Sequence, residues 1–331
     1  MKYSRVVSYV ASQVWAIEPA KLHELLAALA FRAAGQTFTA DEIKARIGDG
    51  GGSSRPSSQG AVAIIPIHGV IAHRMGSMDE TSGGTSCERI GAMIDHVAAD
   101  PNVATILYDY DTPGGTVPGV TELAAKMFAL RGQKSQIAMV QGMACSAGYW
   151  LASQADEIVS IPSGMAGSIG VYCSHEDLSA ALEKEGIKIT LISAGKYKTA
   201  GNVLEPLSDE ERAVLQGRVD VAYGQFVKDV ARGRGVTPAA IRGGYGEGRA
   251  LDAKDAKAAG LIDRIATMDE TLARVVGRKP IGGMRAEGVS PETLAAMEQF
   301  SRDNPELAAQ MIEEEHQRRL KTSEAYRRLL L

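Results

Sequence analysis

Among the residues that could do chemistry, Ser146 has the most suggestive surroundings. It lies in the small-residue segment 143–150, between the apolar run 137–140 and a helix-like stretch. A serine on a tight strand-to-helix turn can act as a nucleophile, because the turn exposes its Oγ and the helix N-terminus favours developing negative charge. The same small residues would also suit close packing of a helix on a sheet. The nucleophile interpretation therefore needs an activating base and an oxyanion site elsewhere in the chain.

Histidine is the usual base for a serine nucleophile, and the chain contains six. Three lie in predicted helices and three near loops, and none has a neighbouring motif that fits a triad. They are His23, His68, His73, His96, His175 and His316. We interpret them as structural or surface residues, although residue content alone permits a Ser-His-Asp triad.

Lysine is the alternative base, because a buried lysine loses the solvation of its charged form and its pKa falls toward neutrality. Two candidates, Lys196 and Lys198, lie among small residues just after the apolar run 187–192. Either could point into a dry pocket, and either could be an ordinary solvated loop lysine. The residues by themselves leave these interpretations open.

An oxyanion site needs backbone N–H groups that approach the substrate closely, which glycine permits. Gly114 and Gly115 follow Thr112 and Pro113 directly after a predicted strand. A plain tight turn would have the same residues. Each of these signals is weak by itself.

The segments around these residues alternate between strand-like and helix-like patterns. Consecutive apolar residues predict strands at 61–67, 103–110, 137–140, 157–161 and 187–192. Apolar residues at helical spacing predict helices at 87–99, 120–130 and 177–185, and a capping box at 208–211 opens a long one. Residues 164–170 are expected to form a Gly-rich turn. The alternation predicts a parallel α/β core with right-handed crossovers.

Composition narrows the class of protein. Of the 331 residues, 45% are hydrophobic and 23% charged, as in ordinary globular proteins, and the net charge of −4 gives no signal for nucleic acid or an anionic membrane. Three cysteines show no metal-ligand spacing and cannot form a disulfide framework, which favours a reducing cytosol. No stretch approaches the roughly 18 apolar residues of a membrane span. We therefore expect a soluble, cytoplasmic protein without nucleic-acid or membrane partners.

Taken in order, these segments resemble the signal peptide peptidase A family of Ser-Lys serine peptidases. The resembling segments, within about 61–270, are 111–115, 144–150, 167–171, 186–188, 195–198, 207–211, 248–250 and 260–263. The resemblance implies an α/β fold like that of the Clp protease and crotonase, a spiral of parallel ββα units. It implies neither a metal nor an organic cofactor.

The resemblance also implies roles for individual residues. Ser146 is expected to be the nucleophile, Lys198 the general base and Ser168 the hydroxyl residue that orients the lysine. Gly114, Gly115 and Ala147 are expected to form the oxyanion hole. Lys198 matches the family motif better than Lys196, because a small or polar residue follows it. The lysine would take the serine proton, attack on the amide would give an acyl-enzyme, and water would release it.

Four parts of the chain are expected on this basis. They are a helical N-terminal module at 1–47, a Gly/Ser-rich linker at 48–60, the Ser-Lys peptidase domain at 61–275 and a charged helical tail at 281–331. The helical ends appended to the core are part of the predicted fold. The tail is interpreted either as a solvated helix or as a contact with an oligomer or partner.

Departures from the family pattern bear on the biological role. Thr112 and Ala147 replace the usual serine and glycine, and no segment of the sequence is expected to form the membrane anchor of the family. The N-terminal module, with its segment 15–19, resembles that of phage and prophage members, head maturation proteases that cut scaffold, portal or capsid proteins. The resemblance further implies a homo-oligomeric ring in which neighbouring subunits complete each active site.

Other functions stay open at this point. A general cytoplasmic peptidase of the same family would degrade peptides or proteins with the same residues. A crotonase-like acyl-CoA enzyme would share the fold without needing Ser146 or Lys198. A non-catalytic assembly or scaffold protein would use the core only as a platform.

Overall fold

The computed structural model describes residues 10, 12–33, 57–59, 61–75 and 84–276. By its contacts the chain divides into two units, Met1–Ile281 and Gly282–Leu331. The second unit, which contains most of the predicted tail, lies outside the described residues, as does most of the predicted linker at 48–60. The fold below is therefore that of the first unit.

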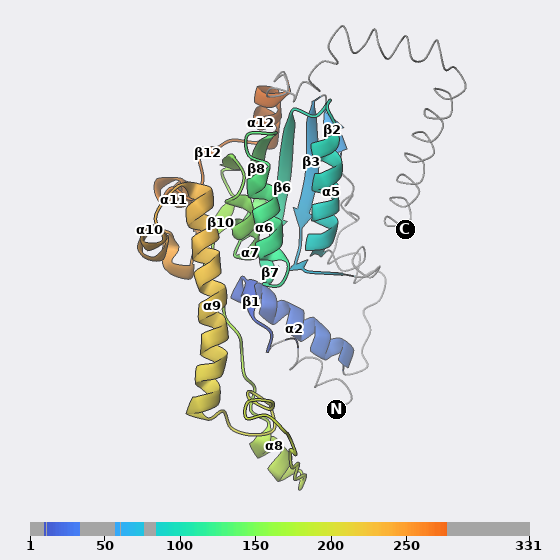
Figure 1. Cartoon of the computed structure of the whole chain (residues 1–331), viewed down its shortest axis with the longest axis vertical. Coiled ribbons are helices and arrows are strands. Elements are labelled where there is room, and N and C mark those ends of the chain that lie inside the picture. The colour runs from blue at the N-terminus through green and yellow to red at the C-terminus, as the bar shows by residue number, and fades with distance from the viewer. Residues whose placement is uncertain (1–9, 11, 34–56, 60, 76–83, 277–331) are drawn as a thin grey trace, which may run out of the picture. The chain divides into compact units, whose positions relative to one another are not determined.

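Among the described residues, eight strands form one sheet with a parallel centre (Figure 1). Its path is β11-β10-β8-β6-β3-β2, with β9 beside β8 and β12 beside β9. The strands are β2 (Ser57–Gln59), β3 (Val62–His68), β6 (Thr105–Thr112), β8 (Ser135–Cys145), β9 (Glu157–Ser160), β10 (Met165–Gly167), β11 (Ala250–Asp252) and β12 (Arg264–Ile265). Antiparallel pairing is confined to β2 and β11 at the ends of the path. The central strands are apolar on consecutive positions because both faces of the sheet are covered.

Helices alternate with these strands, so the predicted parallel α/β core is confirmed. They are α5 (Cys87–Ala99), α6 (Val120–Ala129), α7 (Ala147–Ala152), α8 (Ser179–Lys184), α9 (Asp209–Arg234), α10 (Pro238–Gly244), α11 (Ala253–Ala258) and α12 (Met268–Val275), with a 3-10 turn at Gly246–Gly248. The predicted capping box opens α9, where Ser208 and Glu211 satisfy each other's backbone N–H groups. α9 runs from the core to a distant segment that contains α8 (Figure 1). This segment lies between β10 and α9 in the sequence and is called the excursion.

A second, four-stranded sheet with the order β1-β7-β4-β5 lies beside the first among the described residues. It consists of β1 (Trp15–Ile17), β7 (Gly114–Thr116), β4 (Ile71–Ala72) and β5 (Thr85–Ser86), and α2 (Pro19–Ala33) follows β1. The helical interpretation of residues 1–47 did not include this strand. Pairing of β1 with β7 brings the N-terminal segment to the predicted oxyanion glycines.

Two local predictions were wrong. Residues 187–192 form no strand, and Ile192 is 96% exposed, because the segment lies outside both sheets and pairs with no neighbouring strand. Conversely, the expected Gly-rich turn at 164–170 contains β10, which pairs with β8 on one side and β11 on the other. In both places the presence or absence of a partner strand decides the structure, and a local pattern does not report it.

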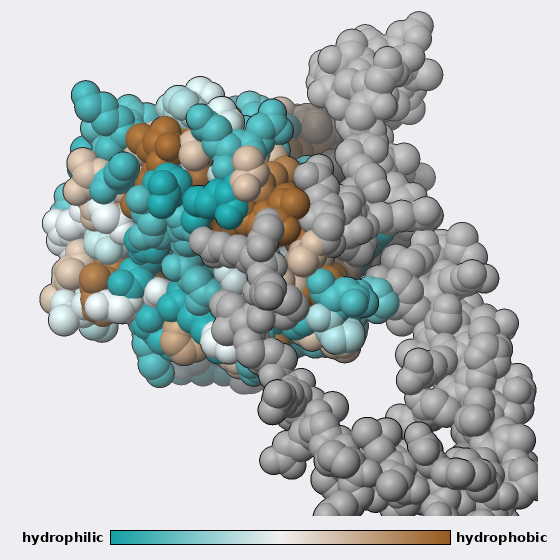
Figure 2. Space-filling view, turned by 90° about the horizontal axis from the view of Figure 1, so that it is seen from above, coloured by the Kyte–Doolittle hydropathy of each residue, from teal (hydrophilic) through white to brown (hydrophobic). Residues whose placement is uncertain are grey.

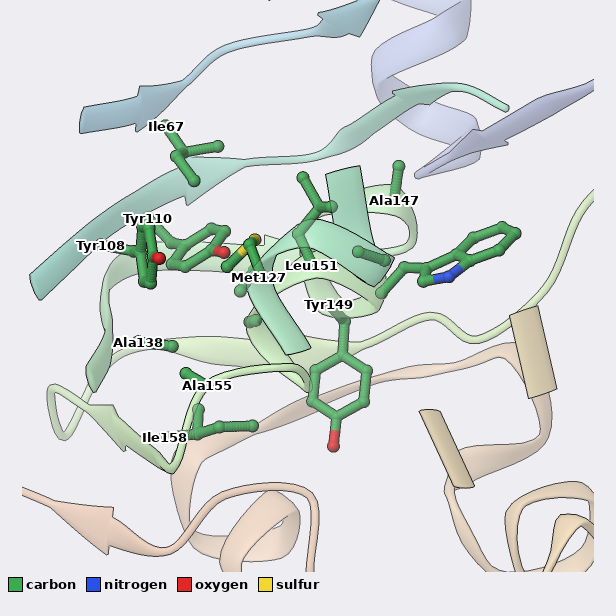
Figure 3. Close-up of a cluster of buried hydrophobic side chains, with 14 of the residues drawn as sticks. Ile67, Tyr108, Tyr110, Met127, Ala138, Ala147, Tyr149, Leu151, Ala155 and Ile158 are labelled. Atoms are coloured by element: carbon green, nitrogen blue, oxygen red, sulfur yellow. The ribbon is translucent and has the colours of Figure 1, made fainter. Parts of the chain in front are cut away.

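The central helix α7 is buried in full and joins the two sides of the core. Trp150 stacks on Phe226 of α9 with ring centroids 4.4 Å apart, and its Nε1 donates to Asp229 at 2.9 Å. On the same helix, Tyr149 donates to Leu261 O at 2.8 Å. Figure 3 shows residues of α7 among aromatic and aliphatic side chains of β6 and α6. These contacts fix the turn that precedes α7.

The described surface carries a mixture of residue types. Seen from above, hydrophilic residues cover much of it, with smaller hydrophobic patches between them (Figure 2). Within the described residues, no helix combines the length and apolar character needed to cross a bilayer.

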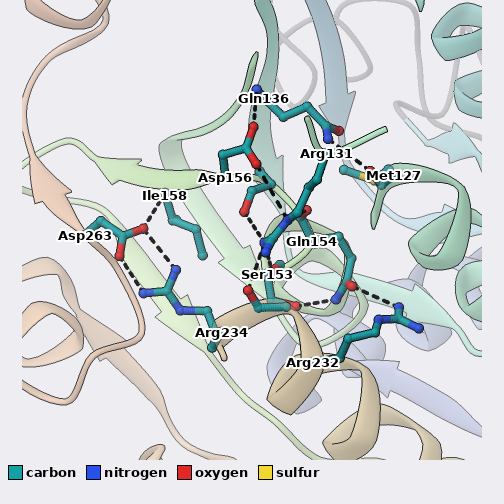
Figure 4. Close-up of polar contacts among 12 residues, drawn as sticks. Met127, Arg131, Gln136, Ser153, Gln154, Asp156, Ile158, Arg232, Arg234 and Asp263 are labelled. Carbon is teal, nitrogen blue, oxygen red and sulfur yellow. Dashed lines mark hydrogen bonds and ion pairs between the residues drawn. The ribbon is translucent and has the colours of Figure 1, made fainter. Parts of the chain in front are cut away.

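Arg131 ties the end of α7 to the end of α9 (Figure 4). Its guanidinium donates to the carbonyl oxygens of Gln154 and Gly233, both at 2.8 Å, and also to those of Ser153 and Ala155. Gly233 must be glycine for this approach, since a Cβ there would collide with Ser153 O. One planar cation thus satisfies four carbonyl groups at the chain reversal after α7.

We expect Arg131→Lys to destabilise the protein by about 2–4 kcal/mol, because an ammonium cannot reproduce the planar fork and leaves partly buried carbonyl groups unpaired. Urea unfolding followed by circular dichroism measures the loss. Lys134→Arg is the control, since this side chain keeps the charge and bonds only Asp100 O and Val103 O. Equal stability of Arg131→Lys and wild type would contradict this account.

Candidate active site

Ser146 lies on the turn between β8 and α7 in a backbone conformation that non-glycine residues rarely adopt, with φ 55° and ψ −117°. Its N–H donates to Gly167 O at 2.8 Å, and its Oγ donates to Gly170 O at 3.3 Å. The side chain is buried. A strained backbone conformation that the surrounding structure holds in place is characteristic of functional positions, and it costs about 1–3 kcal/mol.

A second strained serine stands beside the first. Gly167 pairs with Cys145 in the parallel ladder of β10 and β8, so Ser168 and Ser146 follow directly on paired positions. Ser168 has φ 54°, is 4% exposed, and donates its N–H to Arg249 O at 2.8 Å. The sheet register therefore brings together the two serines named from the sequence.

The glycines of β7 complete one wall of this site. Gly114 has φ 104°, and a Cβ built on it would lie 3.0 Å from the Cβ of Ser146 and would collide with Ala16 O. A Cβ on Gly115 would overlap the backbone of Ile71. Glycine is thus required at both positions by close backbone approach, and at Gly114 that approach includes the candidate nucleophile.

The N–H groups near Ser146 differ in how they are engaged. Ala147 is the first residue of α7, so its N–H has no acceptor within the helix. The N–H of Gly114 donates to the Oγ1 of Thr112 at 3.1 Å. An oxyanion held by Gly114 would have to replace that hydroxyl, whereas one held by Ala147 would displace no intrahelical bond.

Neither candidate lysine lies beside Ser146. Lys196 forms an ion pair with Glu210 at the first turn of α9, and the hydrogen bond from that carboxylate raises the pKa of Lys196. A raised pKa keeps the amine protonated, which is the wrong direction for a base. Lys198 is exposed in the same excursion. Glu210 and Asp229 are separated by roughly 28 Å along α9, and Asp229 contacts Trp150 on α7. Within one chain, these lysines therefore lie far from the serine turn.

The described histidines hold other positions. The Nε2 of His68 lies 3.0 Å from Asp109, and this hydrogen bond raises the pKa of the imidazole, while His175 lies 2.8 Å from Asn202 O. His316 lies outside the described residues. In the described part of the chain, the Oγ of Ser146 bonds Gly170 O and no histidine. The same residues contain no group of three or more His, Cys, Asp or Glu that could hold a metal ion.

Sequence reasoning missed the strand β1, which pairs with the glycine strand at this site. The available signal was the short apolar run 15–17 before Pro19, far from every other candidate in the chain. It named 248–250 only as part of the family resemblance and missed that residues 246–249 lie at this site, where Glu247 has φ 52° and Arg249 O accepts from the N–H of Ser168. Only the pairing of distant strands gathers these segments.

Comparison with known proteins identifies similar chains. Residues 129–279, which include Ser146, Ser168 and both lysines, match Peptidase family S49. The chain is 33% identical over 244 residues to Capsid assembly protease C of Escherichia phage lambda, covering 72% of this chain and 55% of the relative. It is 32% identical over 246 residues to Head-tail preconnector protein GP5 of Enterobacteria phage P21, covering 73% and 48%.

A cellular relative is also similar. Protease 4 of Salmonella typhi is 29% identical over 216 residues, which make up 65% of this chain and 34% of the relative. The chain thus spans about half the length of the phage relatives that it matches and a smaller part of this one.

The small residues after Ser146 also serve packing, and this can be tested. A Cβ at Gly148 would lie 2.5 Å from the Cγ2 of Thr112. We expect Gly148→Ala to cost about 1–3 kcal/mol through overpacking. Thr112→Ser removes that methyl and keeps the hydroxyl that bonds Gly114, so it should recover most of the loss in the double variant. Thermal unfolding of the four proteins gives the coupling, and strict additivity would contradict the packing role.

Proposed function

The chain belongs to peptidase family S49, and we propose that it is a serine endopeptidase in which Ser146 attacks the peptide carbonyl and Lys198 of a neighbouring copy is the base. The lysine amine takes the proton of Ser146 Oγ, and Oγ bonds to the carbonyl carbon. The C–N bond breaks as the lysine returns the proton to the leaving amine. Water then hydrolyses the acyl-enzyme by the same route.

The observation that carries the proposal is the strained Ser146 turn against Gly114. The nucleophile is held by backbone hydrogen bonds, a glycine removes the side chain that would block approach, and the N–H of Ala147 is available to a developing oxyanion. A crotonase-like enzyme or a passive platform would have no use for a serine held at this cost. Ser168, next to Ser146 in the sheet, is proposed to orient the incoming lysine.

The distance between Ser146 and Lys198 supports a base from another copy. The excursion that holds Lys198 exposes large apolar side chains, namely Ile187, Ile189, Ile192 and Tyr197, and Val221 on α9 is also exposed. Apolar groups exposed together favour a protein–protein contact. A ring of copies would cover them and would carry each lysine to a neighbouring serine turn.

The biological role is proposed from the phage relatives. One is called a capsid assembly protease and the other a head-tail preconnector protein. We propose that this chain cuts scaffold, portal or capsid proteins during head assembly in the cytoplasm of a bacterial host. General peptide degradation by the same residues is the alternative.

Mixing two inactive variants tests the shared site. Ser146→Ala and Lys198→Ala should each lose peptidase activity on an unstructured protein. In a 1:1 mixture, about a quarter of randomly assembled sites combine an intact serine with an intact lysine, so about a quarter of the wild-type rate should return. The rate of casein cleavage measures it.

Lys196→Ala is the matched control and should stay active, because Lys196 is bound to Glu210. If the mixture shows no activity although both variants assemble, a base from another copy is excluded. Full activity of Lys198→Ala would exclude Lys198 as the base.

Co-expression tests the biological role. The wild-type chain, produced with the portal, scaffold and capsid proteins of the phage or prophage that encodes it, should shorten at least one of them, and Ser146→Ala should shorten none. Intact-mass measurement identifies the product. Equal cleavage of unrelated unfolded proteins, with all three assembly proteins left intact, would favour the general peptidase.

A further inference from the structure

We propose that strand β1 fills the peptide-binding groove of this site, so that the N-terminal segment blocks the active site of its own chain. This inference rests on the proposed peptidase function and adds its regulation and the form of its substrate. The contacts of residues 14–18 carry it.

One edge of β1 is bonded to the glycine strand. Ala16 pairs with Gly115 and Ile17 with Gly114 in antiparallel register. The ladder continues past the strand, where Glu18 N–H donates to Pro113 O at 2.8 Å. A peptide added to the edge of a sheet makes this kind of pairing.

The other edge of β1 is bonded to the segment that follows Ser168. Trp15 N–H donates to Tyr172 O at 2.8 Å, and Tyr172 N–H donates to Trp15 O at 3.0 Å. Tyr172 lies two residues after Gly170, whose carbonyl accepts from Ser146 Oγ. Thr116 and Tyr172 therefore lie opposite each other on the two sides of Trp15, and the place between them is filled by β1.

The position of β1 relative to the nucleophile shows why it would block a substrate. A Cβ built on Gly114 would collide with Ala16 O and would lie 3.0 Å from the Cβ of Ser146, so the β1 carbonyl and the serine both lie close to Gly114. A substrate strand that paired with Gly115 would bring its own carbonyl to this position, within reach of Ser146. β1 and a substrate therefore exclude each other.

The residues of β1 indicate the form of peptide that the groove accepts. Ala16 is small and fully buried, and it joins the main core. Trp15 and Ile17 flank it and pack with Leu22 and Tyr172 in a separate small cluster. We infer an extended substrate segment with a small residue opposite Gly115 and large apolar residues on either side.

The segment is bound in a way that allows release. Its apolar anchors form a satellite cluster with only three buried members, Trp15, Ile17 and Leu22, among the described residues. In the same part of the structure, the buried Oε2 of Glu18 and the hydroxyl of Tyr172 have no hydrogen-bond partner. Burial, with the charge of Glu18 added, raises the pKa of Tyr172 to about 12. Release of β1 would return these polar groups to water, which favours the open state.

Amide hydrogen exchange in a Ser146→Ala background tests the inference without any chemistry. Trp15→Ala/Ile17→Ala should raise exchange at Gly115 and Tyr172, whose N–H groups face β1, about tenfold or more, because the anchors of β1 are gone. A synthetic peptide with the sequence of residues 12–20 should then protect these amides in the double variant and leave the parent chain unaffected. With Ser146 intact, the double variant should cleave casein about tenfold faster or more than the wild type.

Two further variants separate release of β1 from general loss of structure. Ala16→Pro removes one strand N–H and no buried apolar side chain, and should give the same opening. Val275→Ala, which truncates a buried residue of a different cluster on α12, should leave these amides unchanged.

Each outcome decides between the two proposals. Unchanged exchange in both β1 variants, or opening without protection by the peptide, overturns the groove assignment. Opening with an unchanged, measurable cleavage rate overturns the block. Opening and peptide protection with no cleavage by any chain support the groove and contradict the peptidase function instead.

Discussion

The backbone at Ser146 is the constraint on which the rest of the site depends. A non-glycine residue at φ 55° does not persist unless its surroundings hold it. Here β10 accepts the N–H of Ser146, Trp150 anchors the following helix through Phe226 and Asp229, and Arg131 closes the chain reversal beyond it. The burial of α7 thus maintains the geometry that a nucleophile needs.

The same rigidity explains why the base is proposed to come from another copy. The serine turn is followed by the fully buried helix α7, whereas the segment that holds the lysines extends along α9 with exposed apolar side chains. A catalytic pair divided in this way would be complete only after assembly. In the proposed peptidase, such dependence would limit cleavage to the assembled state.

The strand β1 adds a second level to this arrangement. Its backbone bonds β7 on one edge and Tyr172 on the other, and Ala16 joins the main core, but Trp15 and Ile17 form only a small cluster apart from that core. Backbone pairing gives the fit of a substrate, and the limited burial gives a modest cost of release. Assembly would supply the base, and departure of the N-terminal segment would open the groove.

The sequence by itself indicated the family, the parallel α/β core and its strands β3, β6, β8 and β9 with most of the helices around them, because apolar periodicity and short motifs are local properties. It also named Ser146, Ser168, Gly114 and Gly115 as candidates. Tertiary structure decided what lies next to what: the register that pairs Cys145 with Gly167, the strand β1 beside Gly114, and the distance of Lys198 from Ser146. It also removed the strand expected at 187–192, where no partner strand is present. Pairing between residues far apart in the chain leaves no local pattern, so only the fold could reveal these contacts.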